Sequence, residues 1–157
     1  MADDAALFSR EAELAVLGSI LSDPNCIVDV CAILRPEDFY RLHGRWIYEA
    51  LVKLHQAGEP IDPLTLATDL GRSKRLEGVG GPNFINGLTG KAPSVAHVTR
   101  YARDVKELAT RRSILKFSEE AKKLALNREL SIEEVLDRIA NGALGLCGNA
   151  EDNGHLQ

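Results

Sequence analysis

The sequence predicts an all-α protein in which a compact multi-helix head is followed by a protruding two-helix hairpin. Apolar residues recur at helical spacing along almost the whole chain. Prolines and glycines divide the first part into short helices, whereas no proline follows Pro93. Charge changes at the same boundary, because residues 1–93 hold 9 basic and 13 acidic side chains while residues 94–157 hold 10 of each.

These changes predict four parts of the chain. Residues 1–8 are expected to be a disordered N-terminus, and residues 9–93 the helical head. Residues 94–147 are expected to form the hairpin. Residues 148–157 are polar and are expected to be a disordered tail or the start of a linker. With 157 residues, of which 45% are hydrophobic, the chain is long enough to bury a core.

The first helix is predicted over residues 9–22, because serine is a favoured N-cap and Asp23-Pro24 ends the pattern. A second apolar face follows within residues 27–34. A single helical turn at residues 36–40 is predicted to carry two aromatic side chains inward, and a third long helix follows over about residues 44–57. The residues expected to centre the core are Leu17, Phe39, Tyr40 and Trp46.

Two further short helices are predicted in the head. Asp62-Pro63 provides an N-cap and a first-turn proline, and Pro82 opens a second helix after the glycine-containing stretch 72–81. Ser94 then caps a long helix that ends near Leu126. A capping box, S-x-x-E, opens the last helix at residues 131–134. Its predicted apolar face comprises Ile132, Val135, Leu136, Ile139 and Ala143.

The two hairpin helices differ in predicted length. At about 1.5 Å per residue, residues 95–126 span about 48 Å and residues 132–146 roughly 22 Å. We expect the first half of the long helix to pack on the head and the second half on the return helix. Leucines 115, 126 and 144 would stay partly exposed, which indicates a protein partner or a second copy. The predicted oligomer interface comprises Ile114, Phe117, Ala121 and Leu124, and the predicted partner-docking residues are Phe84 and Ile114.

No catalytic motif is visible in the sequence. Residues 85–92 do not match a phosphate-binding loop, because position 85 is not glycine and position 92 is neither Ser nor Thr. We therefore expect no ATP binding by this chain. The histidines and cysteines show no metal-binding spacing, and the three cysteines are expected to be free thiols in a reducing compartment. The net charge of −4 disfavours a strongly basic nucleic-acid module. No signal peptide or membrane span is expected.

Six segments together resemble the N-terminal domain of DnaB-type replicative DNA helicases, in the family's order and spacing. Each segment is a capping or turn signal, and the resemblance covers roughly residues 9–141. The segments are Ser9–Leu21, Arg35–Arg41, Gly58–Asp62, Gly80-Gly81, Pro93–Ala96 with Tyr101-Ala102, and Arg111-Arg112.

This resemblance implies a cytoplasmic, non-catalytic module of a helicase. In the family, hairpins pair into dimers and three dimers build a collar that receives primase. It also implies that this chain dimerises, as a dimer or a trimer of dimers, and that it binds primase or a helicase loader. ATP and magnesium would serve only a C-terminal motor domain, which this chain lacks, so we expect either a helicase fragment or a natural short protein. DNA contact would be weak or indirect.

Two local departures from the family pattern carry expectations of their own. His43-Gly44 predicts a late start of the third helix, and the glycines within residues 141–148 predict early fraying of the last helix. Two alternative functions stay open. The chain could be a stand-alone regulator that binds a full-length helicase, or a helical nucleic-acid-binding module that uses the basic residues between 100 and 112.

Overall fold

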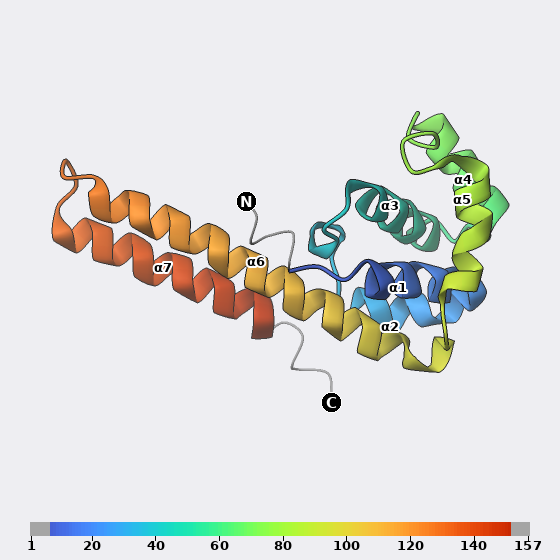
Figure 1. The fold of residues 1–157 in the computed structure, drawn as a ribbon, viewed down its shortest axis with the longest axis horizontal. Coiled ribbons are helices and arrows are strands. Elements are labelled where there is room, and N and C mark those ends of the chain that lie inside the picture. The colour runs from blue at the N-terminus through green and yellow to red at the C-terminus, as the bar shows by residue number, and fades with distance from the viewer. Residues whose placement is uncertain (1–6, 152–157) are drawn as a thin grey trace. The chain divides into compact units, whose positions relative to one another are not determined.

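The computed structural model describes residues 7–151, and this part of the chain contains helices and no strand (Figure 1). The all-α prediction is therefore confirmed. Short 3-10 helices lie at Pro24–Cys26, Pro36–Asp38, Leu88–Lys91 and Val95–His97. The α-helices are α1 (Arg10–Ser22), α2 (Ile27–Cys31), α3 (Leu42–Gln56), α4 (Pro63–Arg72), α5 (Gly81–Gly87), α6 (Val98–Leu126) and α7 (Ile132–Glu151).

The chain divides into two compact units, here called the head (residues 8–107) and the hairpin unit (Leu7 with residues 108–151). The sequence places the start of the hairpin at residue 94, where the long helix begins. In the structure the first turns of α6 belong to the head, because Val98, Ala102 and Val105 are buried in the head core. The expected packing of the first half of this helix is thus observed.

The expected terminal segments fall only partly within the described residues. Residues 1–6 and 152–157 lie outside them. Phe8 is described, and its ring stacks on Tyr40 with centroids 4.5 Å apart. At the other end α7 continues to Glu151, so residues 148–151 are helical although the sequence places the start of a tail there. The glycines within α7 do not end the helix.

The first helix packs very closely on the segment that follows α5. Ser9 caps α1, since its Oγ accepts the backbone N–H of Ala12 at 3.1 Å. Gly18 is buried in the middle of this helix, and a Cβ there would overlap the carbonyl oxygen of Leu88. The missing side chain therefore permits backbone-to-backbone contact between α1 and the 3-10 helix at Leu88–Lys91.

Two aromatic rings anchor the centre of the head. Phe39 and Tyr48 are both fully buried, with ring centroids 4.9 Å apart. The Tyr48 hydroxyl donates a hydrogen bond of 2.9 Å to the carbonyl oxygen of Leu34, which satisfies the polar end of a buried ring. Burial also raises the pKa of this phenol. The predicted core residues Leu17 and Phe39 lie where the sequence places them.

The other two predicted core residues lie elsewhere. Tyr40 is 37% exposed, because the chain is extended at Phe39 and successive side chains of extended backbone point to opposite sides. Its backbone N–H donates to the buried carboxylate of Glu13 at 2.6 Å. Trp46 is partly buried at the edge of the core, where the guanidinium of Arg75 lies 5.2 Å from its ring. Tyr48 therefore takes the core position expected for Tyr40.

The third helix begins at Leu42, earlier than His43-Gly44 suggests. Gly44 is buried, and a Cβ there would lie 3.2 Å from the Phe39 ring. The glycine thus gives the buried ring its space, at a cost to the helix of about 1 kcal/mol.

Ion pairs and a cap fix the remaining head helices. Asp62 caps α4 by accepting hydrogen bonds from the N–H and the hydroxyl of Thr65, which hold the pKa of its carboxyl below the usual value. Lys53 and Asp69 join α3 to α4 at 2.6 Å. Lys106 on α6 pairs with Asp38 at 3.1 Å, and both side chains are largely buried.

In the hairpin unit, α7 runs back alongside α6 after a turn (Figure 1). The capping box is confirmed on one side, since Ser131 Oγ accepts the N–H of Glu134 at 3.2 Å. Phe117 of α6 packs against Gly142 of α7, and a Cβ on this glycine would overlap the Phe117 ring. The glycine that weakens α7 in isolation therefore provides the recess into which the largest side chain of the hairpin packs.

Filling this recess with a larger side chain should weaken the packing of α7 on α6. Gly142→Leu is expected to lower the free energy of unfolding by about 1–3 kcal/mol through overpacking against Phe117. Gly145→Leu is the matched control, because nothing lies within 4 Å of a Cβ at that position. It should be neutral or stabilising, since leucine favours helix more than glycine does. Thermal unfolding followed by circular dichroism compares the two, and equal melting temperatures would contradict the packing.

Candidate interaction surface

Helix α7 carries two apolar stripes, and only one of them faces α6. The stripe that faces α6 contains the less exposed residues of α7, which recur at 4-3-4 spacing. They are Val135, Ile139, Gly142 and Leu146. The second stripe follows every fourth residue, so that its members form one ridge along the helix surface. We call this stripe the outer ridge, and it comprises Ile132, Leu136, Ala140 and Leu144.

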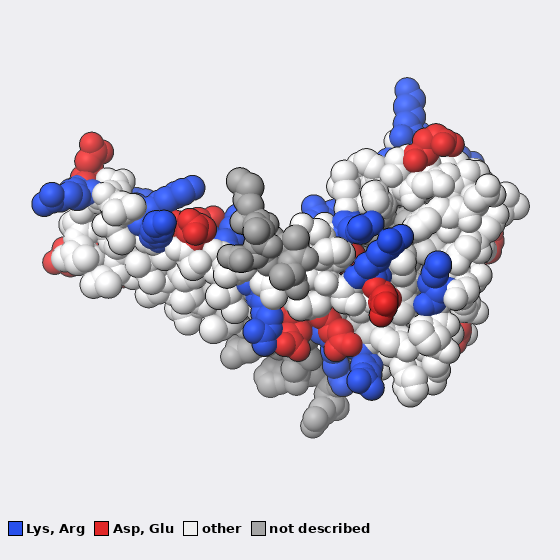
Figure 2. Space-filling view, viewed as in Figure 1, with Lys and Arg blue, Asp and Glu red and all other residues white. Residues whose placement is uncertain are grey.

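The outer ridge is open to solvent over its whole length. Ile132, Leu136 and Leu144 are 63%, 59% and 67% exposed. Burying an aliphatic side chain of this size stabilises by about 1.5–3 kcal/mol, so three of them on one ridge are a substantial source of binding energy. Charged side chains flank the ridge, including Glu134 and Arg138, which pair with each other at 2.7 Å. In Figure 2 the visible surface on the α7 side of the hairpin is mostly uncharged.

The interface residues predicted from the sequence lie mainly on the inner side of the hairpin. Phe117, Ala121 and Leu124 are half-buried, and Phe117 occupies the recess at Gly142. Ile114 is 49% exposed. The expected exposure of Leu126 and Leu144 is confirmed at 71% and 67%.

Sequence reasoning missed the outer ridge because it placed Ile132 and Leu136 on the same face as Val135 and Ile139. In the structure, Val135 is buried whereas Ile132 and Leu136 point to solvent. The four-residue spacing from position 132 to position 144 was the available signal. It indicates a second stripe, because positions four apart on a helix are neighbours.

Phe84, the other predicted docking residue, lies in the head. It is half-buried and lines a cavity of about 270 Å³ formed by α1, the start of α3 and residues 77–84. This cavity and the outer ridge belong to different units and are therefore treated as separate surfaces.

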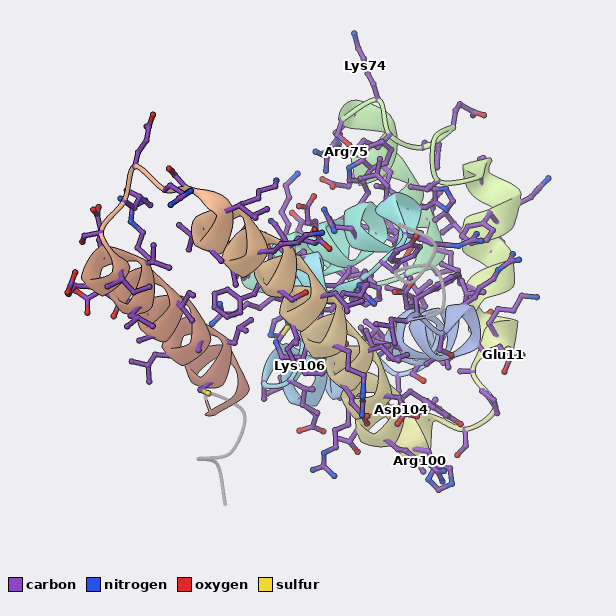
Figure 3. The ribbon with its side chains drawn as sticks, turned by 60° about the vertical axis from the view of Figure 1, so that its left-hand side comes forward. Glu11, Lys74, Arg75, Arg100, Asp104 and Lys106 are labelled. Atoms are coloured by element: carbon purple, nitrogen blue, oxygen red, sulfur yellow. The ribbon has the colours of Figure 1, made fainter. Side chains whose placement is uncertain are left out.

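The basic residues of α6 between positions 100 and 112 are interspersed with acidic side chains. Arg100 is followed one helical turn later by Asp104, and the two lie close together in Figure 3. Lys106 pairs with Asp38, and Arg112 donates a hydrogen bond of 2.6 Å to the carbonyl oxygen of Leu7. Lys106 and Arg112, which were considered for nucleic-acid binding, thus have structural partners.

Other chemistry is sparse in the described residues. Cys26, Cys31 and Cys147 are free, and burial raises the pKa of the Cys26 thiol to about 11. Within residues 7–151, no group of three or more His, Cys, Asp or Glu side chains could hold a metal ion. The same part of the chain contains no helix that is both long enough and apolar enough to cross a membrane.

Comparison with known sequences identifies relatives of this fold. A family model described as the DnaB-like helicase N terminal domain matches residues 5–107. The replicative DNA helicase DnaB of Geobacillus stearothermophilus is 36% identical over 129 residues, which cover 82% of this chain and 28% of that protein. The chain thus spans less than a third of this relative.

Solved structures show the same architecture. The N-terminal domain of DnaB helicase from Mycobacterium tuberculosis matches with a TM-score of 0.80 and 32% identity, over 85% of this chain and 94% of that one. A structure described as the N-terminal domain of DnaB helicase from Helicobacter pylori and its interactions with primase matches with a TM-score of 0.66 and 20% identity, over 80% and 97% of the two chains. The family match covers more than half of the sequence, and the chain belongs to the DnaB-like helicase N-terminal domain family.

Proposed function

We propose that this chain is the N-terminal collar domain of a replicative DNA helicase, acting in the cytoplasm as an assembly and docking module. It self-associates through the outer ridge and receives primase or another replication partner. ATP hydrolysis and DNA unwinding are assigned to a motor domain of the parent protein, and this chain works without a cofactor of its own.

The outer ridge is the observation that carries this proposal. Three aliphatic side chains, each more than half exposed, follow one line along α7. Exposed apolar stripes of this kind mark protein interfaces. A second copy of the chain is the simplest occupant, because a two-fold axis allows one ridge to serve both partners. The relatives add support, since they are replicative helicases and one related structure is described with primase.

A charge on the ridge should separate the copies. In Leu136→Asp, association would bury an unpaired carboxylate, which costs several kcal/mol. We expect a shift toward monomer in size-exclusion chromatography with light scattering, with little loss of helical signal because the position is exposed. Arg128→Glu, in the exposed turn between the two helices, is the control and should leave the mass unchanged.

Substitutions on the inner side of the hairpin should behave differently. Phe117→Asp places a charge against Gly142 and should unfold the hairpin as well as reduce the mass. If Phe117→Asp dissociates a folded protein while Leu136→Asp has no effect, the interface lies on the α6 residues predicted from the sequence, and the assignment to the outer ridge is wrong.

Primase docking is tested separately. Primase from the same organism should bind the wild-type chain in isothermal titration calorimetry. No binding by the wild-type chain under conditions where it self-associates would contradict the docking role and leave the assembly role standing. Binding of an intact replicative helicase in place of self-association would favour the stand-alone regulator.

A further inference from the structure

The head contains a cavity that the assembly role does not use. Its volume is about 270 Å³, at the lower end of the roughly 300–1,000 Å³ of pockets for small molecules and cofactors. A cavity of this size suits a single large side chain inserted from a partner. Anchors of this kind, seated in a preformed pocket, contribute a large share of the energy of many protein interfaces.

The interior of the cavity is mostly apolar, although the buried Glu13 also lines it. It is lined by side chains from α1, α3 and the segment that leads into α5, namely Leu14, Leu17, Ile47, Val79 and Phe84. Leu17, Ile47 and Val79 belong to the buried core, which gives the cavity a rigid floor. Such a surface favours an aliphatic or aromatic occupant.

Glycines shape one side of the opening. Gly80 has a φ of +114°, and a Cβ there would lie 2.9 Å from Cβ of Phe84. A Cβ on Gly78 would lie 2.9 Å from the Trp46 ring. The chain therefore passes close to both aromatic rings without side chains of its own, so the glycines that line the cavity add only backbone to its wall.

The rim is charged asymmetrically. Arg10, Arg41 and His43 come from the starts of α1 and α3, and Glu77 comes from the segment that precedes α5. Glu13 also lines the cavity, but it is 4% exposed and its Oε1 accepts the Tyr40 N–H at 2.6 Å. The solvent-accessible charge on the side of α1 and α3 is therefore positive, although the chain as a whole carries −4.

We propose that this cavity is a docking site for an acidic peptide segment of a partner protein that carries one large aliphatic or aromatic residue. The apolar side chain enters the cavity, and the flanking carboxylates lie against Arg10 and Arg41. Glu77 repels the same carboxylates and so fixes the direction of the peptide. This site lies wholly within the head and does not depend on self-association through the hairpin.

Fluorescence anisotropy with the full chain tests this assignment. The probe is a fluorescein-labelled acidic hexapeptide with one central phenylalanine, and its saturable binding is expected. Replacing the phenylalanine by alanine, or the acidic residues by lysine, should weaken binding at least fivefold. The variant R10E with R41E should weaken binding by a similar factor. Arg10 is exposed, and Arg41 is half-buried with its guanidinium 5.7 Å from the centre of the Phe8 ring, so circular dichroism is used to check that the variant keeps the wild-type fold.

Lys74→Glu provides the control, because it reverses one charge on an exposed head residue that does not line the cavity (Figure 3). It should leave the affinity unchanged. No saturable binding at millimolar peptide, equal binding of the alanine peptide, or equal weakening by Lys74→Glu would each overturn the proposal. Leu136→Asp should bind the peptide like the wild type, so that this site and the hairpin assembly can fail independently.

Discussion

Phe39→Ala should lower the free energy of unfolding of the head by about 3–5 kcal/mol. The ring is fully buried and contacts the Tyr48 ring, and Gly44 has no side chain where the Phe39 ring packs. Since domains of this size are stabilised by only about 5–15 kcal/mol, the variant should be close to unfolded at physiological temperature. Urea unfolding followed by circular dichroism measures the loss.

The neighbouring residue is the matched control for this experiment. Tyr40 is 37% exposed, so Tyr40→Ala loses the stacking contact with Phe8 but creates no cavity in the core. We expect a cost of about 0.5–1.5 kcal/mol, the typical worth of an aromatic pair. Equal losses for the two variants would mean that the turn at residues 36–40 is packed differently from the structure.

Gly18→Ala should also destabilise the head strongly, although alanine favours helix over glycine by about 1 kcal/mol. The added Cβ overlaps the Leu88 carbonyl oxygen and lies 3.3 Å from the backbone N of Ala92. These are backbone atoms and cannot move aside as a flexible side chain would. Overpacking costs about 1–3 kcal/mol, occasionally more, so the net change in stability is expected to be negative.

Gly71→Ala separates the packing effect from helix propensity. Gly71 lies in α4 of the same unit, and the nearest atom to a Cβ there is a Leu76 methyl carbon at 4.0 Å. This variant should gain up to about 1 kcal/mol. Thermal unfolding compares the melting temperatures of both variants with that of the wild type. A stabilised Gly18→Ala would show that α1 does not approach the Leu88 backbone closely.

The sequence was sufficient to predict features that depend on local chemistry. The caps at Ser9, Asp62 and Ser131 lie where short polar side chains precede apolar periodicity. The cap predicted at Ser94 is wrong, because its side chain makes no capping hydrogen bond and the long helix begins at Val98. The fold class follows from that periodicity and from the family resemblance, which the comparisons confirm.

Features that depend on tertiary packing were harder to predict. Tyr40 and Tyr48 are both tyrosines close to Phe39 in sequence. The extended backbone at Phe39 turns the Tyr40 ring outward, whereas Tyr48 lies on the buried face of α3. Gly44 and Gly142 look unfavourable in helices until the rings of Phe39 and Phe117 are placed against them.

The candidate surfaces also combine features that local sequence predicts with features that only tertiary packing determines. Apolar exposure on the hairpin was predictable from two helices of different predicted length that have only each other to pack against, as Leu126 and Leu144 show. Its assignment to the outer ridge required the crossing of α6 and α7, which determines that Val135 faces inward and Leu136 outward. The head cavity joins residues from α1, α3 and the segment leading into α5, and no local pattern brings these together.

Sedimentation equilibrium of the wild-type chain across a concentration series tests the central claim most directly. The account predicts that the average mass rises from that of one 17.1 kDa chain to at least twice that value as concentration increases. The rise should be abolished or moved to much higher concentration in Leu136→Asp. A wild-type protein that remains at the mass of one chain at the highest concentration would contradict self-association through the outer ridge.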